Sequence, residues 1–467
     1  MTTVIHAPPR PIEGSVEAAA RPPRTVLAVA MLGFAAVALD AQVTNVALPA
    51  IHRDLGGGLA GLQWIVAGYT LMFSALLLLA GTISDRIGAR SAYRVGMVLF
   101  VAASVACGLA PSLPFLVAAR LIQGTGAALV TPTSLALIRQ AYEDPAQRAK
   151  AVTYWALGGS AAAAAGPILG GALAQVDWRL IFFLNLPVGV AAVGILTRVG
   201  RSPRRPAAFD WAGQASAVVA LASVTYGVIE GGTLGFANSQ IIGAFVVAAV
   251  ALLVFLMTQA RGAHPMIPLT LFRSRPVAVS LSVALVTMMG FYGVVFLQSL
   301  YFQQLRGASS LTTGLLFLPM SALVTLLNPL VARIAATFGR LVPIMGGQIA
   351  MAAGLVALAV APAHTPTIVV ALLMIPVGVG GSFTVPPIAS LVLDSVVAAQ
   401  AGTASGVLNT FRQLGGSFGV AIFGAIVAAQ ASLLHGMRIS LLGTAVLLTS
   451  TAAATFTLRT SHRSIER

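Results

Sequence analysis

Residues 240–259 read QIIGAFVVAAVALLVFLMTQ, twenty residues without one charged side chain. At a rise of about 1.5 Å per residue, a helix of this length crosses the roughly 30 Å hydrocarbon core of a bilayer. Hydrophobic residues make up 58% of the 467-residue chain and charged residues 8%, whereas about 25% of the residues in a soluble domain are charged. The sequence therefore predicts an all-α polytopic membrane protein and excludes a water-soluble globule.

Fourteen such apolar runs follow one another, and each is expected to form a transmembrane helix. Lys and Arg gather in the two tails and in the loops after even-numbered spans, whereas the opposite loops hold only Arg53, Arg179, Arg306 and Arg438. Because cytoplasmic loops carry the excess of basic residues, both termini are expected in the cytoplasm. The predicted spans are 25–48, 62–80, 93–111, 114–138, 151–174, 180–199, 211–229, 240–259, 277–302, 311–332, 341–361, 367–392, 404–429 and 439–458.

Two basic loops that contain proline divide these spans. Residues 198–206 follow the sixth span, and residues 261–275 precede the last six. The expected arrangement is 6+2+6, in which an inserted hairpin joins two six-helix bundles, and repeated bundles are typical of transporters. The predicted units are a disordered cytoplasmic tail at 1–24, a bundle at 25–200, a linker with the hairpin at 201–275, a second bundle at 276–458 and a cytoplasmic tail at 459–467.

Several chemistries lack the residues that they need. The net charge of +15 is scattered over short loops, which fits helix orientation and contact with anionic lipid, so no nucleic-acid partner is expected. A Walker A loop needs Gly-Lys, but Lys150, the one lysine, follows Ala149. The six histidines are isolated, and no nucleophile elbow is present. The sequence predicts no enzyme, no cofactor and no metal site.

Asp40 and Arg120 are charged residues deep inside predicted spans. At 1.5 Å per residue, Asp40 lies about 13 Å below the outer end of the first span, and Arg120 lies about 9 Å below the same surface in the fourth. Charges inside a membrane are costly and mark functional sites. Burial favours the protonated acid, whereas Arg120 favours the carboxylate, so a proton could switch this pair. The alternative is a permanent salt bridge that fixes the register of the two helices.

The turn after the second span, residues 81–90, reads GTISDRIGAR. Gly81 and Gly88 permit a tight turn, and Asp85 is placed to meet a helix N-terminus, where the helix dipole favours a carboxylate. Arg86 and Arg90 supply positive charge beside it. An ordinary basic loop is an equally good interpretation of these residues alone.

Small residues recur along the fifth span. Spacings of four residues let a second helix approach closely, and proline removes a backbone hydrogen bond and bends the helix. The pattern suits a moving helix, and static close packing is the alternative. The residues concerned are Gly158, Gly159, Ala162, Gly166, Pro167, Gly170 and Gly171.

Taken together, these stretches resemble the major facilitator superfamily, and within it the fourteen-span drug/proton antiporters. The resemblance covers essentially the whole chain outside the tails. The stretch LYFQQLRGA at 300–308 is also similar to that of antibiotic exporters of the methylenomycin A resistance type. The matching motifs are LDAQVTNVALP at 39–49, GTISDRIGAR at 81–90, RLIQGTG at 120–126, GPILGG at 166–171, WR at 178–179, NLP at 185–187, SG at 405–406 and RQLGG at 412–416.

This resemblance implies a major facilitator fold and export of a small hydrophobic compound by alternating access, driven by inward proton movement. Asp40 and Arg120 would couple transport to protons. Asp85 and Arg86 would latch the cytoplasmic side. Gly166 and Pro167, followed by Gly170 and Gly171, would form the antiporter hinge. The expected location is the inner (plasma) membrane of a bacterium, with function as a monomer.

The scarcity of buried acids bears on the cargo. Ala67 stands where cation exporters of this family carry an acid, and Gln42 and Thr44 are unusual in the first motif. A dication needs several buried carboxylates, so a neutral or monovalent cargo is favoured. Residues that could line the chamber are Asn45, Gln123, Phe291, Tyr292, Gln298, Asn328 and Arg412, although helix packing would also explain them.

Two other functions remain open at this stage. A proton-linked importer or facilitator of a small metabolite would share the same bundles, but the motif at Gly166 and Pro167 argues against it. A membrane scaffold without transport activity would have little use for Asp40 and Arg120 at matching depth.

Overall fold

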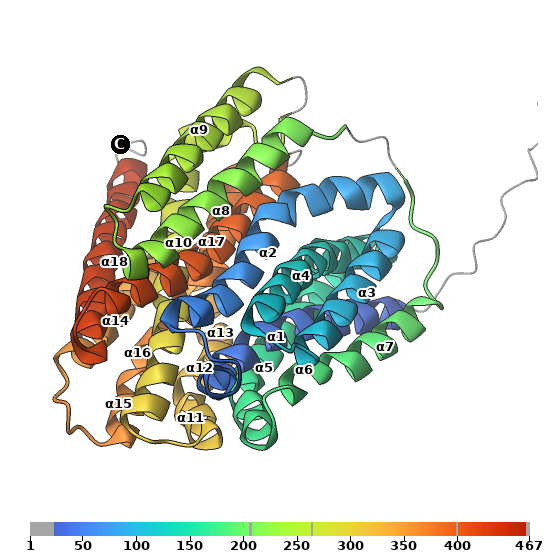
Figure 1. The fold of residues 1–467 in the computed structure, drawn as a ribbon. Coiled ribbons are helices and arrows are strands. Elements are labelled where there is room, and N and C mark those ends of the chain that lie inside the picture. Colours follow the sequence, from blue (N-terminus) through green and yellow to red (C-terminus); the bar gives the residue numbers. More distant parts are fainter. Residues whose placement is uncertain (1–22, 205–207, 263–264, 398–399, 464–467) are drawn as a thin grey trace, which may run out of the picture.

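The computed structural model describes residues 23–204, 208–262, 265–397 and 400–463, in which helices follow one another with short connections (Figure 1). The predicted tails at 1–24 and 459–467 fall largely outside these ranges, although α18 continues to Arg463. The helices before residue 200 are α1 (Pro23–Leu55), α2 (Leu59–Ile87), α3 (Ala89–Gly108), α4 (Leu113–Ala141), α5 (Pro145–Val176), α6 (Leu180–Phe183) and α7 (Asn185–Leu196).

The remaining helices begin with a pair that lies side by side, α8 and α9. A short 3-10 helix (η1) leads into α10, and a single π-helical turn (η2) follows it. In chain order these elements are α8 (Trp211–Leu234), α9 (Ser239–Arg261), η1 (Leu269–Arg273), α10 (Arg275–Leu300), η2 (Tyr301–Leu305), α11 (Ser310–Leu316), α12 (Leu318–Leu326), α13 (Asn328–Phe338), α14 (Leu341–Val360), α15 (Thr367–Leu373), α16 (Ile375–Asp394), α17 (Ala401–Ala428) and α18 (Leu433–Arg463).

Twelve helices of the described ranges are long and apolar enough to cross a membrane, and thirteen if the bent pair α12–α13 is one span. The segment predicted as a span at 311–332 is not one continuous helix, because the chain forms α11, α12 and α13 there, with a bend of 48° between the last two. Pro319 and Pro329 stand at the starts of α12 and α13. Proline lacks the N–H that would continue the preceding helix, so each break falls beside one.

The predicted sixth span, 180–199, is also interrupted. It forms α6 and α7, which together make a shorter apolar segment, Leu180–Leu196. Pro187 lies in the first turn of α7, as Pro376 does in the first turn of α16 after a similar break.

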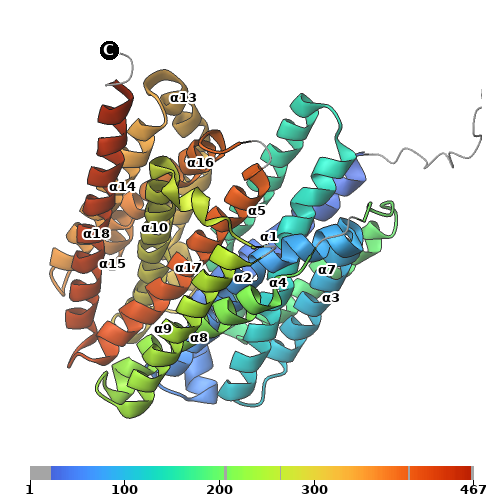
Figure 2. The same cartoon turned by 90° about the horizontal axis from the view of Figure 1, so that it is seen from above.

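The helices pack in two groups that meet along two seams. In the first group α1 packs against α5, and α4 packs against α2 and α3. In the second, α10 packs against α17, and α14 packs against α16 and α18. One seam joins α2 to α17 (Figures 1 and 2), and the other joins α5 to α11 and α12 (Figure 1).

Three turns between consecutive helices share one geometry, and one of them is at Gly235, which joins α8 to α9 with φ 86° and ψ 138°. Gly88 joins α2 to α3 with φ 86° and ψ 139°, and Gly339 joins α13 to α14 with φ 83° and ψ 157°. Positive φ values of this kind favour glycine, since a Cβ would clash with the backbone. The same turn therefore recurs in both groups and in the α8–α9 pair.

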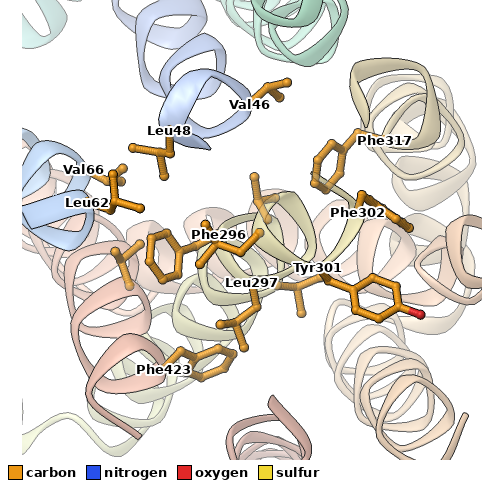
Figure 3. Packing of buried hydrophobic residues seen from close by; sticks show 14 of the residues in the cluster. Val46, Leu48, Leu62, Val66, Phe296, Leu297, Tyr301, Phe302, Phe317 and Phe423 are labelled. Carbon is orange, nitrogen blue, oxygen red and sulfur yellow. The ribbon is translucent and has the colours of Figure 1, made fainter. Parts of the chain in front are cut away.

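A buried apolar cluster lies where α1, α2, α10 and α17 converge (Figure 3). Val46 and Leu48 of α1 face this cluster, and Phe296 of α10 lies within it. Phe302 packs edge-on against Phe317, with ring centroids 6.1 Å apart. Burial of these side chains holds the two groups together at the end where α1 finishes.

Helix α8 rests on both sides of the α2–α17 seam, while α9 packs mainly against α8. Gln214 of α8 donates to the Ala75 carbonyl of α2 at 2.8 Å, and Trp64 of α2 donates to Glu230 of α8 at 2.9 Å. A Cβ on Gly232 of α8 would lie 2.7 Å from the Cα of Ala425 in α17. Helix α8 therefore connects α2 to α17.

Candidate functional site

The centre of the first group holds a buried ion pair. Arg120 Nη1 of α4 lies 2.5 Å from Asp40 Oδ2 of α1, and the two side chains are 1% and 0% exposed. The structure thus brings together the two charges that the sequence places at similar depth. A pair buried this completely needs further hydrogen bonds to offset the loss of water.

Two side-chain amides complete the hydrogen bonding of the carboxylate. Gln123 donates to Asp40 Oδ1 at 2.8 Å, and its own oxygen accepts from Arg120 at 2.7 Å. Asn185, at the start of α7, also donates to Asp40 Oδ1 at 2.8 Å and to the Ser104 hydroxyl of α3 at 3.0 Å. Asp40 therefore accepts three hydrogen bonds, from residues of two helices.

Arg120 is engaged on its other sides as well. Its Nε donates to the Ile65 carbonyl at 3.0 Å, and its guanidinium lies 4.2 Å from the ring centroid of Tyr69. Both contacts come from α2. Cation–π attraction is strongest where water is excluded. The ion pair thus links α1, α2, α4 and α7.

Arg412, in α17, differs sharply from Arg120. The half-buried guanidinium donates to Asn409 on its own helix at 3.1 Å. Its Nε has no hydrogen-bond partner, and no described carboxylate forms an ion pair with it. The ring of Tyr292 of α10 lies against Gly416, four residues further along α17.

The other predicted chamber residues lie apart from the Asp40 cluster. Phe291 and Tyr292 pack edge-on at 5.8 Å. Gln298 is 1% exposed, yet neither of its polar atoms has a partner among the described residues. Asn328 accepts from Ser382 at 3.4 Å. Asn45, also predicted for the chamber, donates to the Ala41 carbonyl of its own helix at 3.0 Å, and its Oδ1 has no described partner.

The 81–90 turn joins α2 to α3, and its charged residues divide into two kinds. Asp85 and Arg86 are exposed, with no ion pair among the described residues, and Arg86 lies 4.9 Å from the ring of Phe209. Arg90 donates to the carbonyls of Leu196 and Thr197 at 3.3 and 3.4 Å. Arg90 therefore caps the end of α7. Gly81 of this turn has open space beside it, whereas Gly88 carries the positive φ.

The small residues of α5 contact both groups. A Cβ on Gly166 would lie 2.5 Å from Gln42, and one on Gly170 would lie 2.8 Å from the Cα of Val43, both in α1. A Cβ on Gly171 would collide with the Ser310 carbonyl of α11, and one on Gly314 of α11 with the carbonyl of Pro167. Helix α5 thus has no room for a side chain at Gly171, where it contacts α11.

The hydrogen bonds that join the two groups cluster toward one end. Ser299 donates to the Asn45 carbonyl at 2.7 Å, Gln303 to the Val46 carbonyl at 2.8 Å, and Gln63 to the Ala421 carbonyl at 2.7 Å. Those near mid-helix, from Ser417 to Ala67 and from Ser321 to Ala164, are longer at 3.4 Å. Among the described residues no such bond occurs at the opposite end.

Sequence reasoning missed three residues of the Asp40 cluster, namely Tyr69, Ser104 and Asn185. The stretch that contains Asn185 was a family match without an assigned role. Helical depth offered a signal, since Asn185 lies inside the predicted span 180–199 and an amide there needs a buried partner. Ser104 and Tyr69 carry no comparable signal, because hydroxyls and aromatic rings are common at helix contacts.

Comparison with known proteins adds relatives over most of the chain. The family model of the Major Facilitator Superfamily matches residues 30–420. Multidrug resistance protein Stp of Mycobacterium tuberculosis is 37% identical over 86% of this chain and 75% of its own. Methylenomycin A resistance protein of Streptomyces coelicolor is 34% identical over 92% of each chain. Tetracenomycin C resistance and export protein of Streptomyces glaucescens is 31% identical over 91% of this chain and 79% of its own.

Solved transporter structures share the fold. The xylose transporter XylE from E. coli, in a partially occluded inward-open conformation, aligns with a TM-score of 0.65 and 17% identity, covering 92% of this chain and 96% of its own. A peptide transporter POT in complex with sulfate gives a TM-score of 0.69 and 14% identity, covering 94% of both chains.

Proposed function

The chain belongs to the Major Facilitator Superfamily, and from that premise we propose that it is a proton-coupled exporter of small hydrophobic drugs or antibiotics. Support comes from three relatives, each more than 30% identical over most of the chain, whose names refer to drug resistance or export. The multi-pass architecture requires a lipid bilayer.

The observation that carries proton coupling is the buried cluster around Asp40. Protonation of Asp40 removes the negative partner of Arg120, and an unpaired buried charge costs about 3–5 kcal/mol. Helices α1 and α4 would then rearrange to resolve that charge. One proton crossing 100 mV gains about 2.3 kcal/mol and one pH unit adds about 1.4, enough to concentrate a neutral cargo roughly 500-fold.

For the topology, we propose fourteen spans arranged 6+2+6, with bundles at 25–200 and 276–458 and both termini in the cytoplasm. The Leu180–Leu196 segment would be about 26 Å long at 1.5 Å per residue, close to the bilayer core. The bent set α11–α13 would form the tenth span.

For the cycle, we propose alternating access with the cytoplasmic side open in this state. Support comes from the hydrogen bonds of Ser299, Gln303 and Gln63, which join the bundles toward the proposed outer side. Asp85, now exposed, would meet the N-terminus of α17 when the cytoplasmic side closes. The glycines of α5 would slide along α1 and α11 during that change.

The test is growth of a drug-hypersensitive bacterial host that expresses the wild type, Asp40→Asn or the control Asp177→Asn. Asp177 is a second acid, 47% exposed and outside the cluster. Panels of neutral antibiotics, lipophilic monocations and dications are compared at equal membrane expression. We expect resistance with the wild type and with Asp177→Asn, lost in Asp40→Asn.

The same variants are assayed in inside-out vesicles, where drug addition should drive proton release only if Asp40 is present. Full protection by Asp40→Asn would overturn coupling through this carboxylate. In these vesicles an exporter moves drug into the lumen. Drug movement out of the lumen would instead make the protein an importer.

A further inference from the structure

Arg120 and Arg412 are the two guanidinium groups deep within the spans, and of these two only Arg412 has no described carboxylate beside it. Arg120 has Asp40, Gln123 and a backbone carbonyl, whereas Arg412 has only Asn409 of its own helix. An unpaired charge inside a membrane is costly, and such residues are kept where they bind something. Its Nε, buried and without a partner, leaves part of its donor fork unused.

The surroundings of Arg412 are apolar and aromatic rather than acidic. The ring of Tyr292 packs over Gly416, one turn along α17 from Arg412, where a Cβ would lie 3.1 Å from the ring. Phe291 adjoins Tyr292 edge-on. Ser417, five residues beyond Arg412 on α17, donates to the Ala67 carbonyl of α2 at 3.4 Å. Arg412 therefore lies on the part of α17 that contacts the other bundle.

The other acids of the described spans are already used. Asp40 neutralises Arg120, Glu230 accepts from Trp64 near the outer end of α8, and Asp394 pairs with Arg340 at the end of α16. The uncompensated charge between the bundles is therefore positive. Such a chamber attracts an anion and repels a lipophilic cation.

We propose that Arg412 anchors the cargo, and that this cargo is a small hydrophobic monoacid whose ionised oxygen group binds the guanidinium. The planar fork of arginine matches a carboxylate with two parallel hydrogen bonds. The apolar body of the cargo lies against Phe291 and Tyr292. This assignment rests on the proposed export function and names its substrate class.

Gln298 supplies a further polar contact for this cargo. It lies two helical turns beyond Phe291 on α10, hence on the same face of the helix. Both its amide atoms are buried without a partner among the described residues. A buried amide normally has hydrogen-bond partners, so a ligand carbonyl or hydroxyl would complete it.

The test measures binding to the purified full chain by thermal shift, because a ligand raises the melting temperature by mass action. The probes are fusidic acid, mupirocin and ibuprofen, each beside its own methyl ester, together with tetraphenylphosphonium. The variants are Arg412→Gln, Arg412→Lys and the control Arg333→Gln, which removes an exposed arginine from α13. Variants are compared only where their unliganded melting temperature and gel-filtration profile match the wild type.

We expect at least one acid to stabilise the wild type and Arg333→Gln, while its ester and the cation do not. Affinity for that acid should fall about tenfold or more in Arg412→Gln, as for loss of a charge-assisted hydrogen bond. Arg412→Lys keeps the positive charge but loses the planar guanidinium, so its affinity for the acid should lie between those of the wild type and Arg412→Gln. A purely structural role for Arg412 would not produce this order.

The proposal is overturned if no acid stabilises the wild type more than its ester, or if Arg412→Gln binds the acid as well as the wild type does. Asp40→Asn separates this result from the exporter proposal. It should still bind the acid while losing proton-driven transport. Normal transport by Asp40→Asn would contradict the proton mechanism and leave the Arg412 assignment standing.

Discussion

Asn185 of α7 donates a hydrogen bond of 2.8 Å to Oδ1 of Asp40 in α1, although the two residues are 145 positions apart in the chain. The same amide reaches the Ser104 hydroxyl of α3. A side chain at the break between α6 and α7 therefore orients the carboxylate that Arg120 neutralises.

The contact between Asn185 and Asp40 predicts an effect on transport without loss of folding. Asn185→Ala removes one donor to a buried carboxylate, worth about 1.5–3 kcal/mol for a charged partner. Efflux in vesicles should fall roughly tenfold or more. Leu186→Ala, at a neighbouring residue that is 40% exposed, is the control and should transport normally. Equal efflux rates for the two variants would show that Asn185 has no role in proton coupling.

The α5–α11 seam should part when a methyl group is added to Gly171. Its Cβ would collide with the Ser310 carbonyl, and overpacking of this kind costs about 1–3 kcal/mol. The measurement is labelling of Ser310→Cys by an impermeant maleimide added from outside. Labelling should be faster in Gly171→Ala than in Gly194→Ala, since Gly194 has no atom near its Cβ position. No change in rate would mean that this seam does not hold the outer side shut.

The two charges of the 81–90 turn should separate into a transport effect and a stability effect. Asp85 forms no described ion pair, so the melting temperature of Asp85→Asn should match that of the wild type. Transport by this variant should fall about two- to fivefold, because a carboxylate at a helix N-terminus contributes about 0.3–1 kcal/mol. Arg90→Ala removes two hydrogen bonds to the end of α7 and should lower the free energy of unfolding by about 1 kcal/mol. Thermal unfolding and efflux of both variants check this. A lower melting temperature for Asp85→Asn would indicate a structural role instead.

The proposed topology is tested by single cysteines at exposed loop positions. Ser112→Cys and Ala237→Cys should react with an impermeant maleimide on intact cells, because their loops follow odd-numbered spans. Arg201→Cys should react only after permeabilisation, provided that Leu180–Leu196 crosses the membrane. Cys107 is buried and stays as background. Labelling of Arg201→Cys on intact cells would show that this segment does not cross.

The membrane class and the helix order could be predicted from apolar runs, since each run must satisfy its own backbone inside lipid. The breaks could not. Pro49, Pro132 and Pro167 lie inside continuous helices, whereas Pro319 and Pro329 start new ones. Neighbouring helices decide whether a proline is tolerated, so the residue alone does not locate a kink.

The site was predictable to a similar degree. Depth along a helix places Asp40 and Arg120 at one level, because the helical rise is fixed. It says nothing about rotation around the axis, which decides that Gln123 joins this cluster and that Gln298 lies elsewhere. Rotation follows from packing between helices far apart in the chain.

Helix α8 fastens α2 to α17 through Gln214, Glu230 and Gly232. In the proposed cycle these contacts hold α2 and α17 together along most of their length, so only the cytoplasmic ends of the two helices part, and the wider opening forms on the α5–α12 side. A hydrophobic molecule dissolved in the inner leaflet would then reach the chamber sideways from that one direction. The extra hairpin would thus determine where around its circumference the transporter collects cargo from the lipid.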